Sequence, residues 1–70
     1  MVFYEWLLEQ ADRDDIVGDF ASDTMRQAQA PGNLVPINST SRKEWLDYLV
    51  MKGDHVIEAF KEAWAEYRNE

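Results

Sequence analysis

Large aromatic side chains are the feature that most constrains how this chain can fold. Three Trp, three Tyr and three Phe occur within 70 residues, and there is no Cys. A chain of this length has room for one small core, which needs disulfides, a metal or bulky apolar side chains to be stable. The missing cysteines exclude disulfides and thiolate sites, so the rings must supply the core volume at roughly 150–250 Å² each. We expect a single domain over residues 1–70 with its rings packed inside.

Apolar residues in the first half of the chain recur at helical spacing. From about Phe3 to Gln10 only the glutamates are clearly expected in water, which predicts a helix buried over most of its circumference. A second helix is expected from about Asp15 to Ala28, after acidic residues that can cap it. Gly18 within this helix costs about 1 kcal/mol relative to Ala, which close approach of a bulky neighbour, such as an aromatic ring, would explain. The apolar stripe of the second helix is Val17, Phe20, Ala21, Thr24 and Ala28.

Residues 31–40 form the one clear linker in the sequence. A Pro-Gly-Asn sequence at residues 31–33 is typical of a turn, and Pro36 keeps the preceding residue extended. Because the linker also holds three apolar side chains, we expect it to pack across the core rather than to form a free loop. These three are Leu34, Val35 and Ile37.

Two more helices are predicted after the linker. Ser41 and Glu44 fit the capping box, in which hydroxyl and carboxylate each accept a backbone N–H. Gly53 marks the end of this third helix, and Asp54 is expected to cap the fourth. The apolar stripes are Trp45, Leu46, Leu49 and Val50 in the third helix, and Val56, Phe60, Ala63, Trp64 and Tyr67 in the fourth. Without a strand pattern or a repeat, the predicted class is all-α, a compact bundle of about four short helices.

Acidic residues outnumber basic ones by 14 to 7, which gives a formal net charge of -7. This field repels polyanions such as DNA at long range, so nucleic acid is a disfavoured partner. Most basic residues lie after residue 40, and any anion-binding surface is expected there. The apolar start carries two glutamates and no leading basic residue, unlike a signal peptide. No stretch approaches the roughly 20 apolar residues of a membrane span, so we expect a cytoplasmic protein without membrane contact.

Patterns that would carry catalysis or metal binding are weak. Asp12 to Asp23 superficially resembles a calcium loop, but Val17 stands where that loop needs Gly, and helix capping explains the acids better. His55 is the only His and is expected on an exposed helical turn. The serines at 39–41 lack the glycine context of an activated nucleophile and fit capping instead. We therefore expect no enzymatic activity, no cofactor and no metal.

The start of the third helix is the best candidate for an anion site. Arg42 and Lys43 follow Ser41 at a helix N-terminus, where backbone N–H groups point outward and favour negative charge. We favour the competing interpretation, in which Arg42 and Lys43 are ordinary surface cations. Glu44 already occupies the capping box, and neighbouring cations are common on protein surfaces. Arg42 and Lys43 are therefore a weak prediction for binding phosphate or nucleic acid.

With these residues placed, the sequence resembles the YozE SAM-like family of small bacterial proteins. The resemblance spans nearly the whole chain, although residues 26–38 look longer than the family's link, and Val35-Pro36 stands for a Phe-Pro pair. It implies a compact helical bundle like the sterile alpha motif and brings no catalytic residue. The matching segments are residues 3–8, 15–23, 39–41, 45–49 and 59–67.

Three functional hypotheses follow from the charge, the lack of site chemistry and the resemblance. The leading one is a non-enzymatic module whose acidic faces meet a basic surface of another protein. The first alternative is a nucleic-acid-associated module that uses Arg42 and Lys43, with Lys52 as a further contact. The second is an acidic mimic of DNA that binds a DNA-handling protein. An enzyme ranks last. Fold analogy alone supports none of these functions strongly.

Overall fold

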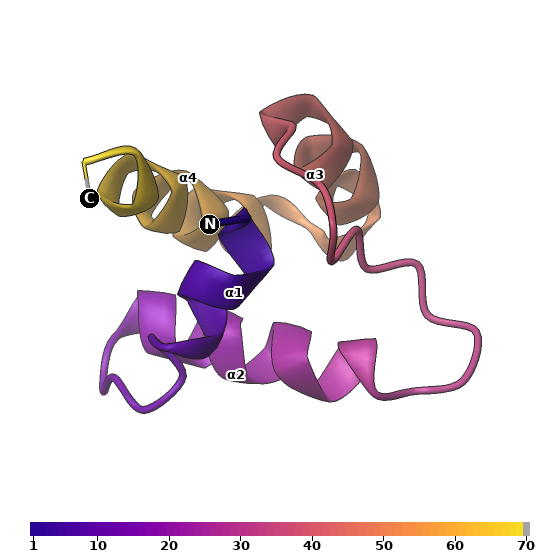
Figure 1. Ribbon diagram of the computed structural model, residues 1–70, viewed down its shortest axis with the longest axis horizontal. Coiled ribbons are helices and arrows are strands. Elements are labelled where there is room, and N and C mark those ends of the chain that lie inside the picture. The colour runs from indigo at the N-terminus through magenta and orange to yellow at the C-terminus, as the bar shows by residue number, and fades with distance from the viewer. Residues whose placement is uncertain (70) are drawn as a thin grey trace.

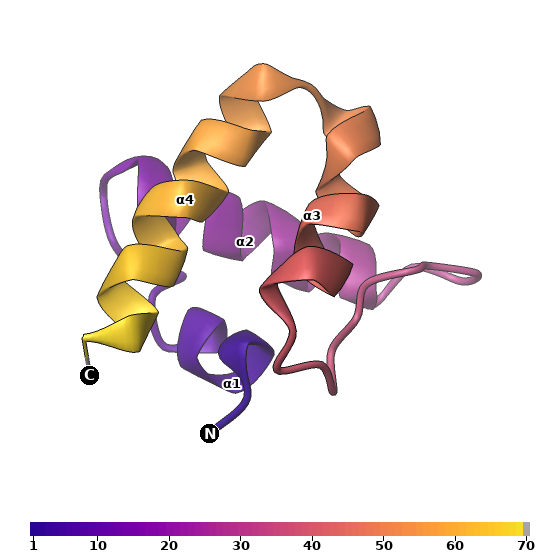
Figure 2. The same cartoon turned by 90° about the horizontal axis from the view of Figure 1, so that it is seen from above.

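Four α-helices and one short 3-10 helix make up this computed structural model, which describes residues 1–69. The described residues contain no strand, so the all-α prediction is confirmed (Figure 1). Helix α4 contacts α1, α2 and α3, and it crosses α2 while α1 and α3 lie on the same side of it (Figure 2). The elements are α1 (Phe3–Leu8), α2 (Ile16–Ala28), α3 (Arg42–Leu49), η1 (Val50–Lys52) and α4 (Asp54–Arg68).

Phe3 lies at the centre of an aromatic core. Its ring is fully buried, and five other ring centroids lie between 4.9 and 5.8 Å from it. Three of these contacts are edge-to-face, a geometry that the ring quadrupoles favour. Because these rings come from α1, α3 and α4, one residue of a six-residue helix joins three elements. The partners are Trp6, Trp45, Phe60, Trp64 and Tyr67.

The prediction that the rings are used as packing is confirmed. All three Phe and all three Trp are buried, and the three Tyr are half-buried against the same cluster. The Trp45 indole N–H is buried without a hydrogen-bond partner among residues 1–69, so this ring is held by packing alone. The Tyr67 hydroxyl donates to the Met1 carbonyl at 2.6 Å, which places the start of the chain beside the end of α4.

Side-chain caps define the starts of α2 and α3. The Gly18 N–H donates to the Asp15 carboxylate at 2.9 Å, as predicted for an acidic cap. The Glu44 N–H donates to the Ser41 hydroxyl at 3.3 Å, which is the expected first half of the capping box. The second half runs through an additional residue, since the Ser41 N–H donates to Ser39 Oγ and that hydroxyl donates to the Glu44 carboxylate at 2.7 Å.

Two predicted helix boundaries are wrong. Asp54 does not cap α4; it is the first residue of that helix, and the cap position is Gly53, which makes no side-chain hydrogen bond. Gly53 has φ 102°, a conformation that Gly adopts readily and other residues rarely. Helix α1 ends at Leu8 rather than near Gln10, whose side-chain amide instead donates to the Trp6 carbonyl at 3.1 Å.

The linker is only partly packed, contrary to expectation. Val35 is buried in the core, and Asn33 orders the turn by donating to the carbonyls of Ala28 and Ala30 at 3.0 Å. However, Leu34 is 82% exposed and Ile37 is also exposed. One apolar side chain therefore anchors the loop, and the neighbouring ones point away from the core. In the third helical stripe Val50 is likewise exposed, because the chain tightens into η1 there.

Backbone contact, not an aromatic ring, explains Gly18. A Cβ at this position would lie 1.9 Å from the Arg13 carbonyl oxygen and 2.9 Å from the Arg13 Cβ. The turn between α1 and α2 thus doubles back directly onto the first turn of α2. The predicted close approach to Gly18 is confirmed, but the approaching group is Arg13 and not an aromatic ring.

Arg13 ties this turn to α4. Its guanidinium bonds both oxygens of Glu66, at 2.6 and 3.1 Å, and also the Asp15 carboxylate at 2.7 Å. The hydrogen bonds from Arg13 lower the pKa of the Glu66 carboxyl. The pKa of Asp15 is also lowered, first by the Gly18 N–H and then by Arg13. Both carboxylates are partly exposed, so solvent weakens the interaction.

Gly18→Ala should destabilise the domain although it raises helix propensity. In an unconstrained helix the change would stabilise by about 1 kcal/mol. Here the clash with the Arg13 carbonyl forces the turn to move, and we expect a net loss of about 1–3 kcal/mol in the free energy of unfolding. Urea denaturation measures it, with Ser22→Ala on the same helix as a control near zero. A more stable Gly18→Ala protein would contradict the close approach.

Arg13→Met should remove a pH-dependent part of the stability. Because Asp15 and Glu66 have lowered pKa values in the folded state, their contribution is present above the ordinary carboxyl pKa and is lost as pH falls through the folded values. The stability difference between parent and variant should therefore be present at neutral pH and shrink below about pH 4. Denaturation across pH 2–7 measures it, with Arg26→Met as the exposed control. A stability difference between parent and variant that stays the same at every pH would contradict a contribution from the ion pairs of Arg13 with Asp15 and Glu66.

Candidate interaction surfaces

Arg42 and Lys43 at the start of α3 are engaged separately. The Arg42 guanidinium lies 5.9 Å from the centre of the buried Phe60 ring, a cation–π distance. Lys43 pairs with Asp47 one turn along the helix at 3.2 Å. Both cations are exposed, and Glu44 beside them adds a negative charge. Phosphate binding at these residues stays a prediction, and the geometry gives it no added support.

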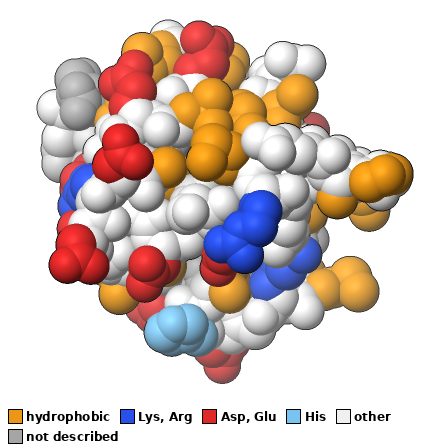
Figure 3. Space-filling model, turned by 90° about the horizontal axis from the view of Figure 1, so that it is seen from below, with side chains coloured by type: hydrophobic (Ala, Val, Ile, Leu, Met, Phe, Trp, Pro, Cys, Tyr) orange, Lys and Arg blue, Asp and Glu red, His pale blue; other side chains and the backbone are white. Residues whose placement is uncertain are grey.

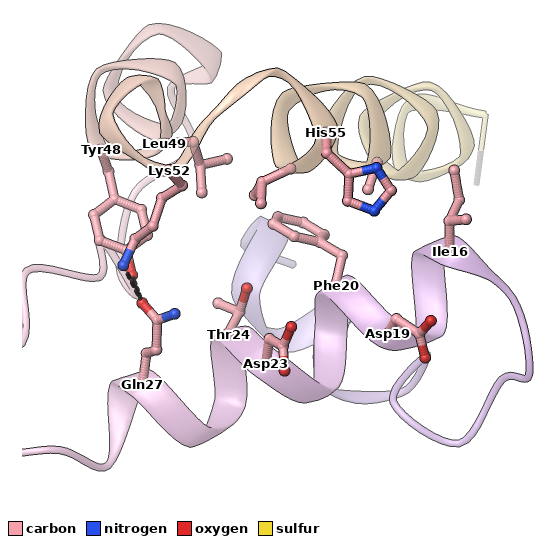
Figure 4. Close-up of a pocket in the computed structure, with 12 residues that line it drawn as sticks. Ile16, Asp19, Phe20, Asp23, Thr24, Gln27, Tyr48, Leu49, Lys52 and His55 are labelled. Atoms are coloured by element: carbon pink, nitrogen blue, oxygen red, sulfur yellow. Dashed lines mark hydrogen bonds between the residues drawn. The ribbon is translucent and has the colours of Figure 1, made fainter.

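A cavity of about 100 Å³ lies between α2, the start of α4 and the junction of α3 with η1. Figure 4 shows Phe20 and Leu49 facing each other across it, and the buried Ala59 adds to its inner wall. The hydroxyl of Thr24 points into the same space. Thr24 is only 4% exposed, and its side chain makes no hydrogen bond within residues 1–69.

Charged side chains surround the mouth of this cavity. Asp19 and Asp23 lie one helical turn apart on α2, whereas Lys52 and His55 lie on the opposite side (Figure 4). Asp23 also pairs with the exposed Arg26 at 2.8 Å, and Asp19 has no cationic partner among the described residues. Since Arg26 offsets Asp23, the α2 side of the mouth presents Asp19 as its one carboxylate without a cationic partner among residues 1–69.

Three polar side chains close the cavity at its η1 end. The Tyr48 hydroxyl and the Lys52 ammonium group both donate to the Gln27 amide oxygen at 2.6 Å. Lys52 also lies 5.2 Å from the centre of the Tyr48 ring. Burial raises the pKa of the Tyr48 hydroxyl, which keeps it protonated as a donor. This Gln27–Tyr48–Lys52 wall separates the cavity from a shallow hollow under Leu34.

An exposed apolar patch lies on the other side of that wall. We call it the Leu34–Met51 patch and define it as Leu34, Pro36, Tyr48 and Met51, which line one hollow together with the carboxylates of Glu44 and Asp47. Met51 is 91% exposed. Apolar side chains project at one edge of the face in Figure 3, while acidic side chains gather mostly on the opposite side. Met51 and Leu34 are the two most exposed of the large apolar side chains in residues 1–69.

Sequence reasoning did not find the cavity or the patch. Thr24 stood in the predicted stripe of the second helix, whereas Ala59 was in no predicted stripe. A cavity results because both side chains are small where α2 and α4 face each other. The small size of Thr24 and Ala59 was the feature of the sequence that could have indicated a cavity. The patch was missed because the apolar linker residues were expected to be buried. His55 is exposed, as predicted.

Residues 1–69 contain no group of three or more His, Asp or Glu side chains placed to hold a metal ion. No helix in the same range combines the length and apolar character needed to cross a membrane.

Comparison with known proteins identifies a family. Neither the curated proteins nor the solved structures include a significant match to this chain. A family model described as the YozE SAM-like fold matches residues 2–69, nearly the whole chain. The observed all-α architecture agrees with that description, and the resemblance noted in the sequence is confirmed. The chain is therefore a member of the YozE SAM-like fold family.

Proposed function

We propose that this chain is a non-enzymatic module that binds another protein in the cytoplasm through the Leu34–Met51 patch. The observation that carries the proposal is the exposure of Leu34 and Met51 on neighbouring segments, the linker and η1. Leaving both side chains in water forgoes apolar burial worth about 1.5–3 kcal/mol for each. A partner surface that covers them would recover this free energy. Contiguous apolar groups with a polar border are typical of protein-binding sites.

Charge selects the kind of partner. Glu44 and Asp47 border the patch, and the whole chain has a formal charge of -7. A basic surface with apolar side chains at its centre complements this arrangement and is steered toward it. A second copy of the chain would bring like charge to like charge, which disfavours self-association. The acidic border therefore favours a different, basic protein.

The alternatives have less support. Lys43 is paired with Asp47, Arg42 lies over Phe60, and the carboxylate of Glu44 beside them opposes the binding of a phosphate. A DNA mimic would be a special case of the proposed binding, in which the partner's basic surface is a DNA-binding one. Competition by DNA for the partner distinguishes that case.

Photo-crosslinking in cells that produce the protein tests the patch directly. With p-benzoylphenylalanine in place of Met51, we expect one discrete protein partner to be captured, and less of it as salt rises toward 0.5 M. The matched control carries the same crosslinker in place of Leu8, an apolar residue of α1 that is 40% exposed. Leu34→Glu should abolish capture from position 51 while changing stability by no more than about 0.5 kcal/mol, because the side chain is in solvent.

Two results would contradict the proposal. One is an identical set of captured proteins from positions 51 and 8, which would indicate random collision. The other is tight DNA binding by the parent that Arg42→Glu with Lys43→Glu abolishes in a gel-shift titration. That result would favour the nucleic-acid alternative instead.

A further inference from the structure

We propose that the cavity between α2, α4 and the α3–η1 junction receives one branched aliphatic side chain of a partner protein. A basic residue next to it in the same segment would contact Asp19 and Asp23. This inference rests on the proposed function and adds a specific recognition pocket to it.

The size of the cavity selects an aliphatic side chain. Its volume is about 100 Å³, whereas an engineered apolar cavity that binds benzene measures roughly 150 Å³. A four-carbon Leu or Ile side chain fits this space better than an aromatic ring does. The apolar lining is supplied by Phe20, Leu49, Val56 and Ala59 from three separate elements.

The Thr24 hydroxyl is the polar group that the cavity wall offers to a bound segment. The Thr24 side chain is largely buried, but its hydroxyl is not sealed from solvent and stays accessible from the cavity. Thr24 lies within α2, where an apolar residue such as Val would fill the same volume. The hydroxyl is aimed into the cavity, in position to accept a hydrogen bond from a bound N–H donor (Figure 4).

The acidic mouth identifies the charge of the bound segment. Asp19 and Asp23 lie on the same face of α2 as Thr24, so three acceptors are spaced over little more than one turn. Lys52 is held by Gln27 at 2.6 Å on the opposite side, and Arg26 on α2 is paired with Asp23, which leaves Asp19 as the open carboxylate. A cationic neighbour of the aliphatic side chain would therefore meet carboxylates, and an anionic one would be repelled.

The cavity and the Leu34–Met51 patch are parts of one surface. The Gln27–Tyr48–Lys52 wall lines the cavity on one side and the hollow under Leu34 on the other. A single segment crossing this wall can place an apolar side chain on the patch and another in the cavity. Continuity with the proposed interface makes a protein segment a better occupant than a free small molecule.

Nuclear magnetic resonance titration with small probes tests the chemistry of the cavity without the partner. We expect 3-methylbutylammonium to shift the amide signals of Phe20, Thr24 and Ala59 saturably. It should bind at least about tenfold more tightly than 3-methylbutanoate, which has the same apolar body and the opposite charge. It should also bind more tightly than 2-methoxyethylammonium, which has the same charge and a polar body. Equal binding of the two charge types, or shifts scattered over the surface, would overturn the proposal.

A peptide pair separates a protein segment from a free amine. The capped tripeptide Lys-Leu-Lys should bind at the same amides, and Lys-Gln-Lys should not. If the amine binds and neither peptide does, the occupant is a small cationic molecule and the proposal of a protein segment is wrong.

Variants complete the test. Ala59→Leu should fill the cavity and abolish probe binding. Where that variant unfolds, Asp19→Asn with Asp23→Asn provides a surface change that should weaken the amine and not the carboxylate. Thr24→Val should reduce binding without lowering the unfolding temperature, because it removes an unpaired hydroxyl. If a variant that loses probe binding still captures the partner from position 51 as well as the parent does, the partner does not use the cavity. That result would refute the cavity proposal alone and leave the proposed function standing.

Discussion

Packing of the Phe3 ring against rings from α1, α3 and α4 is the contact on which the rest of the structure depends. A domain of this size has a total stability of only about 4–10 kcal/mol, from roughly 0.05–0.15 kcal/mol per residue. Truncating one buried ring commonly costs about 3–5 kcal/mol. The sequence has no Cys, so no disulfide compensates for that loss. The shortest α-helix thus contributes the most central side chain.

This core also determines where the surface sites lie. Phe60 packs on Phe3 and on Phe20, which sets the position of α4 against α2. Toward the start of α4 the facing residues become small, Thr24 on one side and Ala59 on the other, and the cavity opens there. The chain reaches that region through η1 and Gly53, which leave Met51 in solvent beside the linker. The same turn of the backbone at η1 also positions the Gln27–Tyr48–Lys52 wall and the Leu34–Met51 patch.

Helix number, helix type and core rings could be predicted because they depend on local periodicity and on the size of apolar residues. Asp15 and Ser41 were likewise recognisable as caps from their neighbours alone. The features that escaped prediction depend on contacts between distant parts of the chain. The Arg13 backbone against Gly18, the relay through Ser39 and the cavity at Thr24 each require the positions of two segments. Leu34 was misplaced because composition shows that a loop is apolar, not which of its residues turns inward.

Unfolding of Phe3 variants, followed by denaturant titration and near-ultraviolet circular dichroism, tests the central role of this ring most directly. Phe3→Ala should lose about 3–5 kcal/mol and most of the aromatic dichroism, because five ring contacts disappear together. Phe3→Leu should lose less, since the apolar volume is largely kept. Leu8→Ala on the same helix, at a 40% exposed position, should change little. A Phe3→Ala protein with the parent's unfolding midpoint and dichroism would contradict the account.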